Sequence, residues 1–273
     1  MDKFSGILLC TDLDGTVLNS NKEVSKENLD AIEYFKSRGG LFTFITGRMP
    51  MTSRKICATL NPNVPYGCIN GGGIYDPQKN EMLWMTTLPR TALRLMDLVY
   101  ETMPDVGMLV DAPDVVYFSR DNAAMKKFRK IVELPDLFKH HNDVTEPIAK
   151  IIFTHDDDGR MAELAKLLNS HPLAPEFDFI RSAKDLYEIL PKGNSKGNVL
   201  VRMADMLGVS MDKTIAIGDY DNDISMIRAA KIGYAVANAS EGAKKAADII
   251  TVSNNEHAIA KIIDDLDKKK IEL

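Results

Sequence analysis

Near its N-terminus the chain reads Ile7-Leu8-Leu9-Cys10-Thr11-Asp12-Leu13-Asp14-Gly15-Thr16, an apolar run that passes directly into an acidic turn. The uninterrupted apolar run predicts a strand over residues 7–11 that is buried on both faces, as in the interior of a parallel sheet. Open parallel sheets bind their ligands beyond the carboxyl ends of the strands. Asp12 and Asp14 therefore lie where such a sheet would place its functional site.

The segments that follow alternate between strand and helix patterns. Ser25 is a suitable N-cap for a helix that ends at Gly39-Gly40. Strands are predicted over residues 41–45 and 65–69, with a short helix over residues 51–60 between them. Strands and helices in alternation, joined by short links, predict an α/β fold with a doubly wound, Rossmann-like parallel sheet.

The last third of the chain continues this alternation. The pattern predicts helices over residues 196–207, 222–230 and 257–267, and strands over residues 214–218, 233–236 and 249–252. Gly208 is placed to end the first of these helices. Together with the N-terminal segment, this region is expected to complete one parallel-sheet core.

Residues 83–190 have a different pattern, with shorter strand signals and several proline-containing turns. Strands are predicted over residues 115–119, 150–154 and 187–190, and helices over residues 92–101 and 161–168. We interpret residues 83–190 as an inserted α/β cap domain that sets substrate specificity, and residues 1–82 and 191–273 as one catalytic core. Links near residues 83–87 and 190–193 would make the insert a hinged lid.

The composition argues against several classes of protein. The 273 residues carry a net charge of −5, so neither nucleic acid nor an anionic membrane is expected as the main partner. No apolar run approaches the ~20 residues that span a bilayer, and the apolar region before Asp12 is too short for a signal peptide. Three cysteines without paired spacing are typical of reduced thiols. We expect a soluble, cytoplasmic protein, and a monomer because no pattern suggests an interface.

A second acidic cluster, Gly218-Asp219-Tyr220-Asp221-Asn222-Asp223, follows the strand predicted over residues 214–218. Carboxylates that converge at one sheet edge repel each other unless a cation compensates, and a hard divalent ion such as Mg²⁺ prefers such oxygen ligands. Mg²⁺ keeps positions for phosphate oxygens, so the substrate implied is a phosphate ester or anhydride. For either cluster alone, the plainer alternative is a solvated turn or a helix cap.

Other metal and phosphate sites do not match the sequence. The cluster after residue 218 fails as an EF-hand loop, since Ile224 stands where glycine is required and Ala230 where the bidentate glutamate is required. The chain contains no Gly-Lys dipeptide, which excludes a Walker A loop, and none of the three cysteines is followed six positions later by arginine. The five histidines show no metal-ligand spacing and are expected at the surface or in turns.

Two further segments are interpreted as turns. Asn70-Gly71-Gly72-Gly73 lacks the spacing of a dinucleotide-binding loop and indicates a tight turn that leaves the core. Asp156-Asp157-Asp158-Gly159 indicates a turn that caps the helix after it.

Four segments occur in the order of the four motifs of the haloacid dehalogenase superfamily: Asp12-Leu13-Asp14-Gly15-Thr16, Ile45-Thr46-Gly47-Arg48, Lys196, and Gly218-Asp219-Tyr220-Asp221-Asn222-Asp223. The surroundings resemble the Cof-type phosphatases of subclass IIB. Asn70-Gly71-Gly72-Gly73-Ile74-Tyr75-Asp76 is similar to the turn that precedes the cap of that subclass. The segment Glu188-Ile189-Leu190-Pro191-Lys192-Gly193-Asn194-Ser195-Lys196-Gly197 is similar to the return to its core. The likeness covers essentially the whole chain. One mild departure from the family's motifs is Tyr220, where the family often has a small polar residue.

The resemblance implies the catalytic roles. Asp12 would be the nucleophile that forms an aspartyl-phosphate, and Asp14 would protonate the leaving oxygen and then deprotonate the attacking water. Asp12, the main-chain carbonyl of Asp14, and Asp219 would hold Mg²⁺. Lys196 would offset the charge of Asp12 and of the transferring group.

The resemblance also implies how the phosphate is bound. The implied phosphate ligands are Leu13, Thr46, Gly47, Lys196 and Asn222. Of these, Thr46 and Gly47 would hold phosphate oxygens at a helix start, although a helix N-cap is the simpler explanation of Thr46. Asp223 would support the site by orienting Lys196 or a metal-bound water, and Arg48 would brace its loop by ion pairing.

The sequence thus predicts a Mg²⁺-dependent phosphatase of small phosphorylated metabolites, with sugar phosphates as one candidate class. A phosphomutase of the same subclass is the nearest alternative. A non-catalytic sensor of phosphorylated ligands is a second, and it is disfavoured because a sensor needs neither a nucleophile nor an acid/base group.

Overall fold

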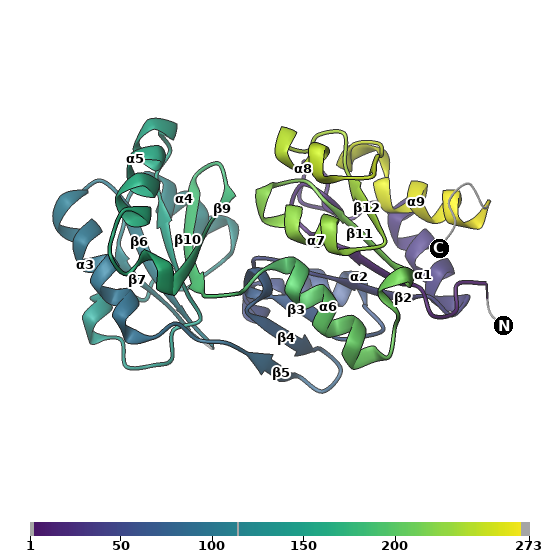
Figure 1. Cartoon of the computed structure of the whole chain (residues 1–273), viewed down its shortest axis with the longest axis horizontal. Coiled ribbons are helices and arrows are strands. Elements are labelled where there is room, and N and C mark those ends of the chain that lie inside the picture. Colours follow the sequence, from purple (N-terminus) through teal and green to yellow (C-terminus); the bar gives the residue numbers. More distant parts are fainter. Residues whose placement is uncertain (1–2, 114, 269–273) are drawn as a thin grey trace. The chain divides into compact units, whose positions relative to one another are not determined.

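The computed structural model describes residues 3–113 and 115–268, and the chain divides into two compact units (Figure 1). The first unit comprises the chain up to Arg48, residues Ser53–Trp84, and the chain from Ser195 onward. The second comprises Met49–Thr52 and Met85–Asn194. No helix in the described part of the chain is long and apolar enough to cross a membrane.

The first unit is built on a five-stranded parallel sheet with the strand order β13-β12-β11-β1-β2. Its strands are β1 (Leu8–Thr11), β2 (Leu41–Phe44), β11 (Thr214–Gly218), β12 (Ile232–Ala235) and β13 (Ile249–Ile250). Leu8, Leu9 and Cys10 are all fully buried, although successive side chains of a strand point to opposite faces. Both faces of the sheet are therefore covered, and the predicted α/β fold with a parallel sheet is confirmed.

Helices pack around this sheet. They are α1 (Lys26–Ser37), α2 (Pro50–Leu60), α6 (Lys196–Leu207), α7 (Ile224–Ala229), α8 (Glu241–Ala246) and α9 (Ala258–Asp267). Side chains of α6 and α7 pack with Leu8 and Cys10 of β1, whereas α1 packs against α9. The predicted caps are confirmed: the Ser25 hydroxyl accepts the Asn28 N–H at the start of α1, and Gly208 ends α6 in the left-handed conformation.

A small second sheet in the first unit adds to one prediction. It has the order β3-β4-β5, with β3 (Tyr66–Cys68), β4 (Gly73–Asp76) and β5 (Glu81–Met85). The strand predicted over residues 65–69 is present as β3, which forms a parallel bridge to the parallel sheet at Ile45–Gly67 and also pairs antiparallel with β4, a strand that was not predicted. The turn η1 (Ile69–Gly71) reverses the chain between β3 and β4, which makes the antiparallel pairing possible.

The second unit holds a five-stranded antiparallel sheet with the order β7-β6-β8-β10-β9. Its strands are β6 (Gly107–Ala112), β7 (Val115–Arg120), β8 (Lys150–Thr154), β9 (Phe177–Ala183) and β10 (Leu186–Pro191), and its helices are α3 (Leu93–Thr102), α4 (Ala123–Ile131) and α5 (Asp158–Asn169). Met96, Phe153, Leu164 and Ile189 belong to the core formed between this sheet, α3 and α5. Asp157 caps α5, as predicted, by accepting the Arg160 N–H.

Other predictions for the second unit were incomplete or wrong. The strands β6 and β9 and the helix α4 were not predicted, since β6 begins at a glycine and both strands carry charged residues among apolar ones. His141 was expected at the surface or in a turn. It lies in a short 3₁₀ helix but is fully buried, with its ring nitrogens hydrogen-bonded to Ser119 and Asp97.

Short 3₁₀ helices complete the secondary structure. They are η1 (Ile69–Gly71), η2 (Arg90–Ala92), η3 (His141–Asp143), η4 (Ala174–Glu176), η5 (Met211–Lys213), η6 (Asp221–Asp223) and η7 (Asn254–Glu256). The single helix predicted over residues 222–230 is instead η6 followed by α7.

The two ends of the second unit are tied together by side chains. The Thr86 hydroxyl lies 2.9 Å from Asn194 Oδ1 and 2.6 Å from Asn194 Nδ2. The segments on which the chain enters and leaves this unit are therefore held side by side.

Three charged side chains are buried on neighbouring strands of the second unit. Lys150 Nζ lies 3.0 Å from Glu188 Oε2 and 3.7 Å from Asp111 Oδ2, and Ser182 also hydrogen-bonds Glu188. Burial raises the pKa of Asp111 to about 6, against the attraction of Lys150, and the negative charge of Glu188 adds to the rise. The ionised form of Asp111 is thus unfavourable in the folded protein.

This burial predicts a pH-dependent effect of Asp111→Asn. The raised pKa means that the folded state holds a proton up to about pH 6 that the unfolded state has already lost, so stability falls as the pH rises through this range. At pH 7.5 the asparagine variant should be more stable than the wild type by about 3 kcal/mol, and at pH 4 the two should be nearly equal in stability. Urea unfolding at both pH values measures the difference. Asp143→Asn, at an exposed position of the same unit, is the control, and an equal effect of both variants would contradict the assignment.

Candidate active site

Asp12 directly follows β1, which lies between β11 and β2 in the parallel sheet. Its N–H donates to the Ile217 carbonyl at 2.9 Å, which continues the pairing of β1 with β11 by one residue. Its side chain is buried, with only 5% of the residue exposed. Burial raises the pKa of Asp12 well above its usual value, and the charges of Asp223 and Asp219 add to the rise, whereas Lys196 lowers it.

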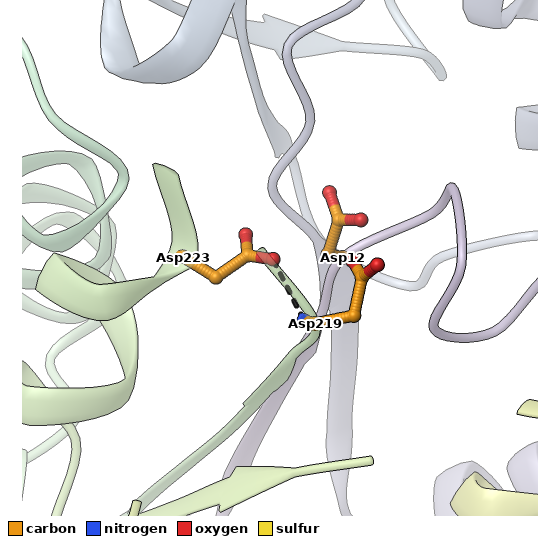
Figure 2. A group of neighbouring side chains, drawn as sticks. All are labelled: Asp12, Asp219 and Asp223. Atoms are coloured by element: carbon orange, nitrogen blue, oxygen red, sulfur yellow. Dashed lines mark hydrogen bonds between the residues drawn. The ribbon is translucent and has the colours of Figure 1, made fainter. Parts of the chain in front are cut away.

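Asp219 follows β11, the strand next to β1, so the two acidic turns meet although 206 residues separate them. Carboxylate oxygens of Asp12, Asp219 and Asp223 all lie within 4.8 Å of one another (Figure 2). The Thr16 hydroxyl donates to Asp219 Oδ1 at 3.2 Å. At Gly15 a Cβ would come within 2.3 Å of Asp219 Oδ2, so this close approach requires glycine.

Lys196 is the first residue of α6 and reaches into the acidic group. Its Nζ lies 2.5 Å from both Asp12 Oδ1 and Asp223 Oδ1, and the residue is only 1% exposed. Burial alone would lower the pKa of Lys196, but the two carboxylates raise it. The ammonium group therefore stays charged and holds both aspartates.

Asp223 has an orienting role within this group. Its Oδ2 accepts the backbone N–H groups of Asp219 at 2.9 Å and of Tyr220 at 3.1 Å, and the first of these bonds is drawn in Figure 2. Its Oδ1 accepts from Lys196. Both oxygens are thus engaged in holding the turn after β11 and the lysine.

The donor set fits a divalent cation. Three carboxylates against the one ammonium group of Lys196 leave the cluster with an excess of negative charge. Burial, followed by the charge of Asp223, raises the pKa of Asp219 to about 7 although Lys196 and Thr16 lower it. A hard cation with oxygen ligands would remove this penalty. With both Asp223 oxygens engaged, Asp12 and Asp219 are the carboxylates best suited to hold it.

The Asp14 side chain is turned to a different partner. Its two oxygens accept from Arg48 Nε and Nη2, each at 2.8 Å, and Lys22 Nζ lies 3.1 Å from Oδ1. Burial alone would raise the pKa of Asp14, but the bonds and charges of Arg48 and Lys22 lower it to about 2. The carboxylate is thus ionised and is not a member of the acidic group formed by Asp12, Asp219 and Asp223.

The expected phosphate ligands lie on loops around Asp12. Thr46 follows β2 and is buried, and its hydroxyl accepts the Arg48 N–H at 3.2 Å. It does not cap a helix, because α2 begins only at Pro50. Leu13 is buried in the turn after β1. Asn222, which is 6% exposed, lies in η6.

Two contacts of the site were not predicted from the sequence. Arg48 was expected to brace its loop by ion pairing, and it forms a two-bond ion pair, but its partner Asp14 was not predicted. Asn70 was assigned only to a tight turn, yet its Oδ1 accepts from Asn222 Nδ2 at 3.0 Å. The Asn-Gly-Gly sequence signalled an unusual backbone at that position, but nothing in it indicated the partner.

Comparison with known proteins agrees with this geometry. Residues 9–263 match the haloacid dehalogenase-like hydrolase family. A pyridoxal phosphate phosphatase of Escherichia coli is 28% identical over 270 residues, which cover 94% of this chain and 97% of the relative. A 5-amino-6-(5-phospho-D-ribitylamino)uracil phosphatase of Bacillus subtilis is 28% identical over 284 residues, with 94% and 97% covered.

A solved structure has the same fold. A sugar phosphatase of haloacid dehalogenase subclass IIB superposes with a TM-score of 0.84 at 21% identity, covering 94% of this chain and 98% of the other, which shows a shared fold. The resemblance predicted from the four motifs is confirmed, and the chain belongs to the haloacid dehalogenase-like hydrolase family.

Proposed function

We propose that this protein is a Mg²⁺-dependent phosphatase that hydrolyses small phosphorylated metabolites through a phosphorylated Asp12. The observation that carries the proposal is the buried contact of Asp12 with Lys196, beside Asp219 at the carboxyl edge of the sheet. For a carboxylate to attack a phosphate, it must be held in place and the repulsion between the two anions must be reduced. The ammonium group of Lys196 and a site suited to a cation provide both.

The first step transfers the phosphoryl group to Asp12. One Asp12 oxygen forms a bond to phosphorus while the bond between phosphorus and the ester oxygen breaks, and Asp14 supplies a proton to the departing alcohol. Lys196 neutralises charge on Asp12 and on the phosphoryl oxygens throughout. Asp12, Asp219 and the Asp14 carbonyl oxygen would hold a Mg²⁺ ion, which would screen the repulsion between the carboxylate and the anionic substrate.

The second step regenerates the enzyme. Asp14, which has lost its proton in the first step, takes one from water as the water oxygen bonds to phosphorus. The bond between Asp12 and phosphorus breaks, and inorganic phosphate leaves. The pairing with Arg48 keeps Asp14 ionised, which suits this half of the cycle, and the contact must loosen for Asp14 to act as the acid in the first half.

The substrate phosphate is bound, in this proposal, by groups from four segments of the chain: the turns after β1 and β2, the start of α6, and η6. These groups are the backbone of Leu13 and Gly47, the Thr46 hydroxyl, Lys196 and the Asn222 carboxamide. Leu13, Thr46, Lys196 and Asn222 are buried, which supports the assignment, since buried donors act on an anion in a low-dielectric setting.

Substrate choice is assigned to residues 83–190, the proposed cap. The relatives named for pyridoxal phosphate and for a phosphoribitylamino-uracil support a small phosphorylated metabolite as substrate. The net charge of −5 supports a small molecule in preference to nucleic acid. A monomeric, cytoplasmic enzyme remains part of the proposal.

Asp12→Asn tests the nucleophile. The variant should lose activity by about four orders of magnitude, because an amide does not attack phosphorus. It should stay folded, since burial already disfavours the charged form of Asp12. Phosphate release from a panel of phosphorylated metabolites, with circular dichroism for the fold, measures both. The exposed Asp212→Asn is the matched control. Near wild-type turnover in a folded Asp12→Asn protein would reject the mechanism.

Asp14→Asn separates the two steps. With p-nitrophenyl phosphate, whose leaving group needs no proton, the variant should release about one equivalent of nitrophenol per enzyme in a burst and then turn over slowly. Substrates with alkyl leaving groups should show no burst. Stopped-flow absorbance gives the amplitude, and a steady wild-type rate without a burst would contradict the acid/base role.

Metal removal tests the acidic group. Dialysis against a chelator should lower activity at least about a hundredfold, and Mg²⁺ should restore it, because the substrate and the carboxylates repel each other without a cation.

Free phosphate should appear without any bisphosphate activator, which distinguishes the phosphatase from a phosphomutase. Full activity in excess chelator would argue against the proposed site.

A further inference from the structure

The turn η1 (Ile69–Gly71) carries an unusual amount of backbone strain for a buried segment. Ile69, Asn70 and Gly71 have φ angles of +57°, +50° and +94°, and all three residues are buried. The left-handed region costs little for glycine and is tolerated by asparagine, but it is unfavourable for β-branched isoleucine. Strain of this kind persists only where surrounding contacts hold the backbone in place.

Those surrounding contacts come from the proposed phosphate site. The Asn70 N–H donates to the Thr46 carbonyl at 3.1 Å, and the Ile69 N–H donates to the Arg48 carbonyl at 3.1 Å. The Asn70 carboxamide lies so close to Gly47 that a Cβ there would come within 2.9 Å of Asn70 Oδ1. The strained turn is therefore joined to the loop that contains Thr46 and Gly47.

The same carboxamide also orients Asn222. Asn222 Nδ2 donates to Asn70 Oδ1 at 3.0 Å in a buried contact. An amide nitrogen has two N–H bonds, and the one directed at Asn70 fixes the plane of the Asn222 carboxamide and hence the direction of the other. Left-handed backbone at Asn70 is what directs its side chain to both Gly47 and Asn222.

The turn further contacts the start of α6. A Cβ at Gly71 would come within 2.1 Å of the Ser195 carbonyl oxygen, and Ser195 caps the helix whose first residue is Lys196. One turn of three residues thus touches the segments that carry Thr46, Asn222 and Lys196.

We propose that Asn70 is a positioning residue of the phosphate site, which fixes the Asn222 carboxamide and the Gly47 backbone before substrate binds. This inference rests on the proposed function, since it assigns Asn70 a task toward the bound phosphate. Donors that are already held in the binding orientation lose little conformational entropy when the phosphate binds. The loss of Asn70 therefore weakens phosphate binding, although Asn70 itself does not touch the substrate.

Asn70→Gly is the sharpest test, because glycine accepts the left-handed backbone and removes only the carboxamide. The variant should bind inorganic phosphate about tenfold more weakly in isothermal titration calorimetry with Mg²⁺ present, and its KM for p-nitrophenyl phosphate should rise by a similar factor. Asn61→Gly is the matched control, since Asn61 also has positive φ, at +45°, but is exposed. It should change neither quantity.

A double-mutant cycle tests whether Asn70 acts through Asn222. In an Asn222→Ala background, the further change Asn70→Gly should cost less than about threefold in phosphate affinity, because its main dependent group is already gone. An equal, additive loss in both backgrounds would overturn the inference. If Asn70→Gly does not fold, Asn70→Asp retains the acceptor and the turn but adds a negative charge, and it should weaken phosphate binding by more than tenfold.

The outcomes separate this inference from the proposed function. Unchanged phosphate affinity in a folded Asn70→Gly protein, together with an inactive Asp12→Asn protein, rejects the role of Asn70 and retains the phosphatase. A wild-type protein that neither binds inorganic phosphate nor releases it from any ester rejects the proposed function, and the inference with it.

Discussion

The buried ammonium group of Lys196 is the interaction on which the first unit depends. It joins Asp12, at the end of β1, to Asp223, in η6 after β11, and it comes from the first turn of α6. Without that lysine, Asp12 and Asp223 would be two buried carboxylates with no cation between them. Removing one partner of a buried ion pair typically lowers the stability of a protein by several kcal/mol. A single cation thus fixes three segments that are far apart in the sequence.

The second unit also buries a lysine between two carboxylates, but in a different setting. Asp111, Lys150 and Glu188 lie within the strands of an antiparallel sheet, whereas Asp12, Asp223 and Asp219 lie in turns beyond strand ends. Within a strand, the backbone N–H groups form the hydrogen bonds of the sheet. The negative charge of a carboxylate buried there is therefore compensated by side chains. Turns after parallel strands have backbone N–H groups outside the sheet ladder, and Asp223 accepts two of them, from Asp219 and Tyr220. The acidic turns therefore compensate a buried carboxylate with backbone donors as well as with Lys196.

Sequence patterns predicted the features that depend on local chemistry. The apolar run before Asp12 predicted the buried strand β1, and the same pattern before Asp219 predicted β11. These strands are neighbours, so the two acidic turns meet at one edge of the sheet. The antiparallel pairing of β3 with β4 was not predicted, because the glycine-rich segment after β3 was assigned only to a turn. The pairing of Arg48 with Asp14, the burial of His141 and the contact of Asn70 with Asn222 were not predictable, since each depends on segments brought together only by the fold.

The reciprocal bond of Thr86 with Asn194 has a consequence for how such a protein is assembled in evolution. The first and last segments of the second unit lie side by side. The unit can therefore be inserted between β5 and α6 without moving these two elements far apart, and the insertion costs little loop-closure entropy. The surrounding unit keeps its own segments at their original spacing. Recombination can therefore exchange the inserted unit as a module. Under the proposed assignment of substrate choice to residues 83–190, such an exchange would change the substrate preference and leave the residues around Lys196 unchanged.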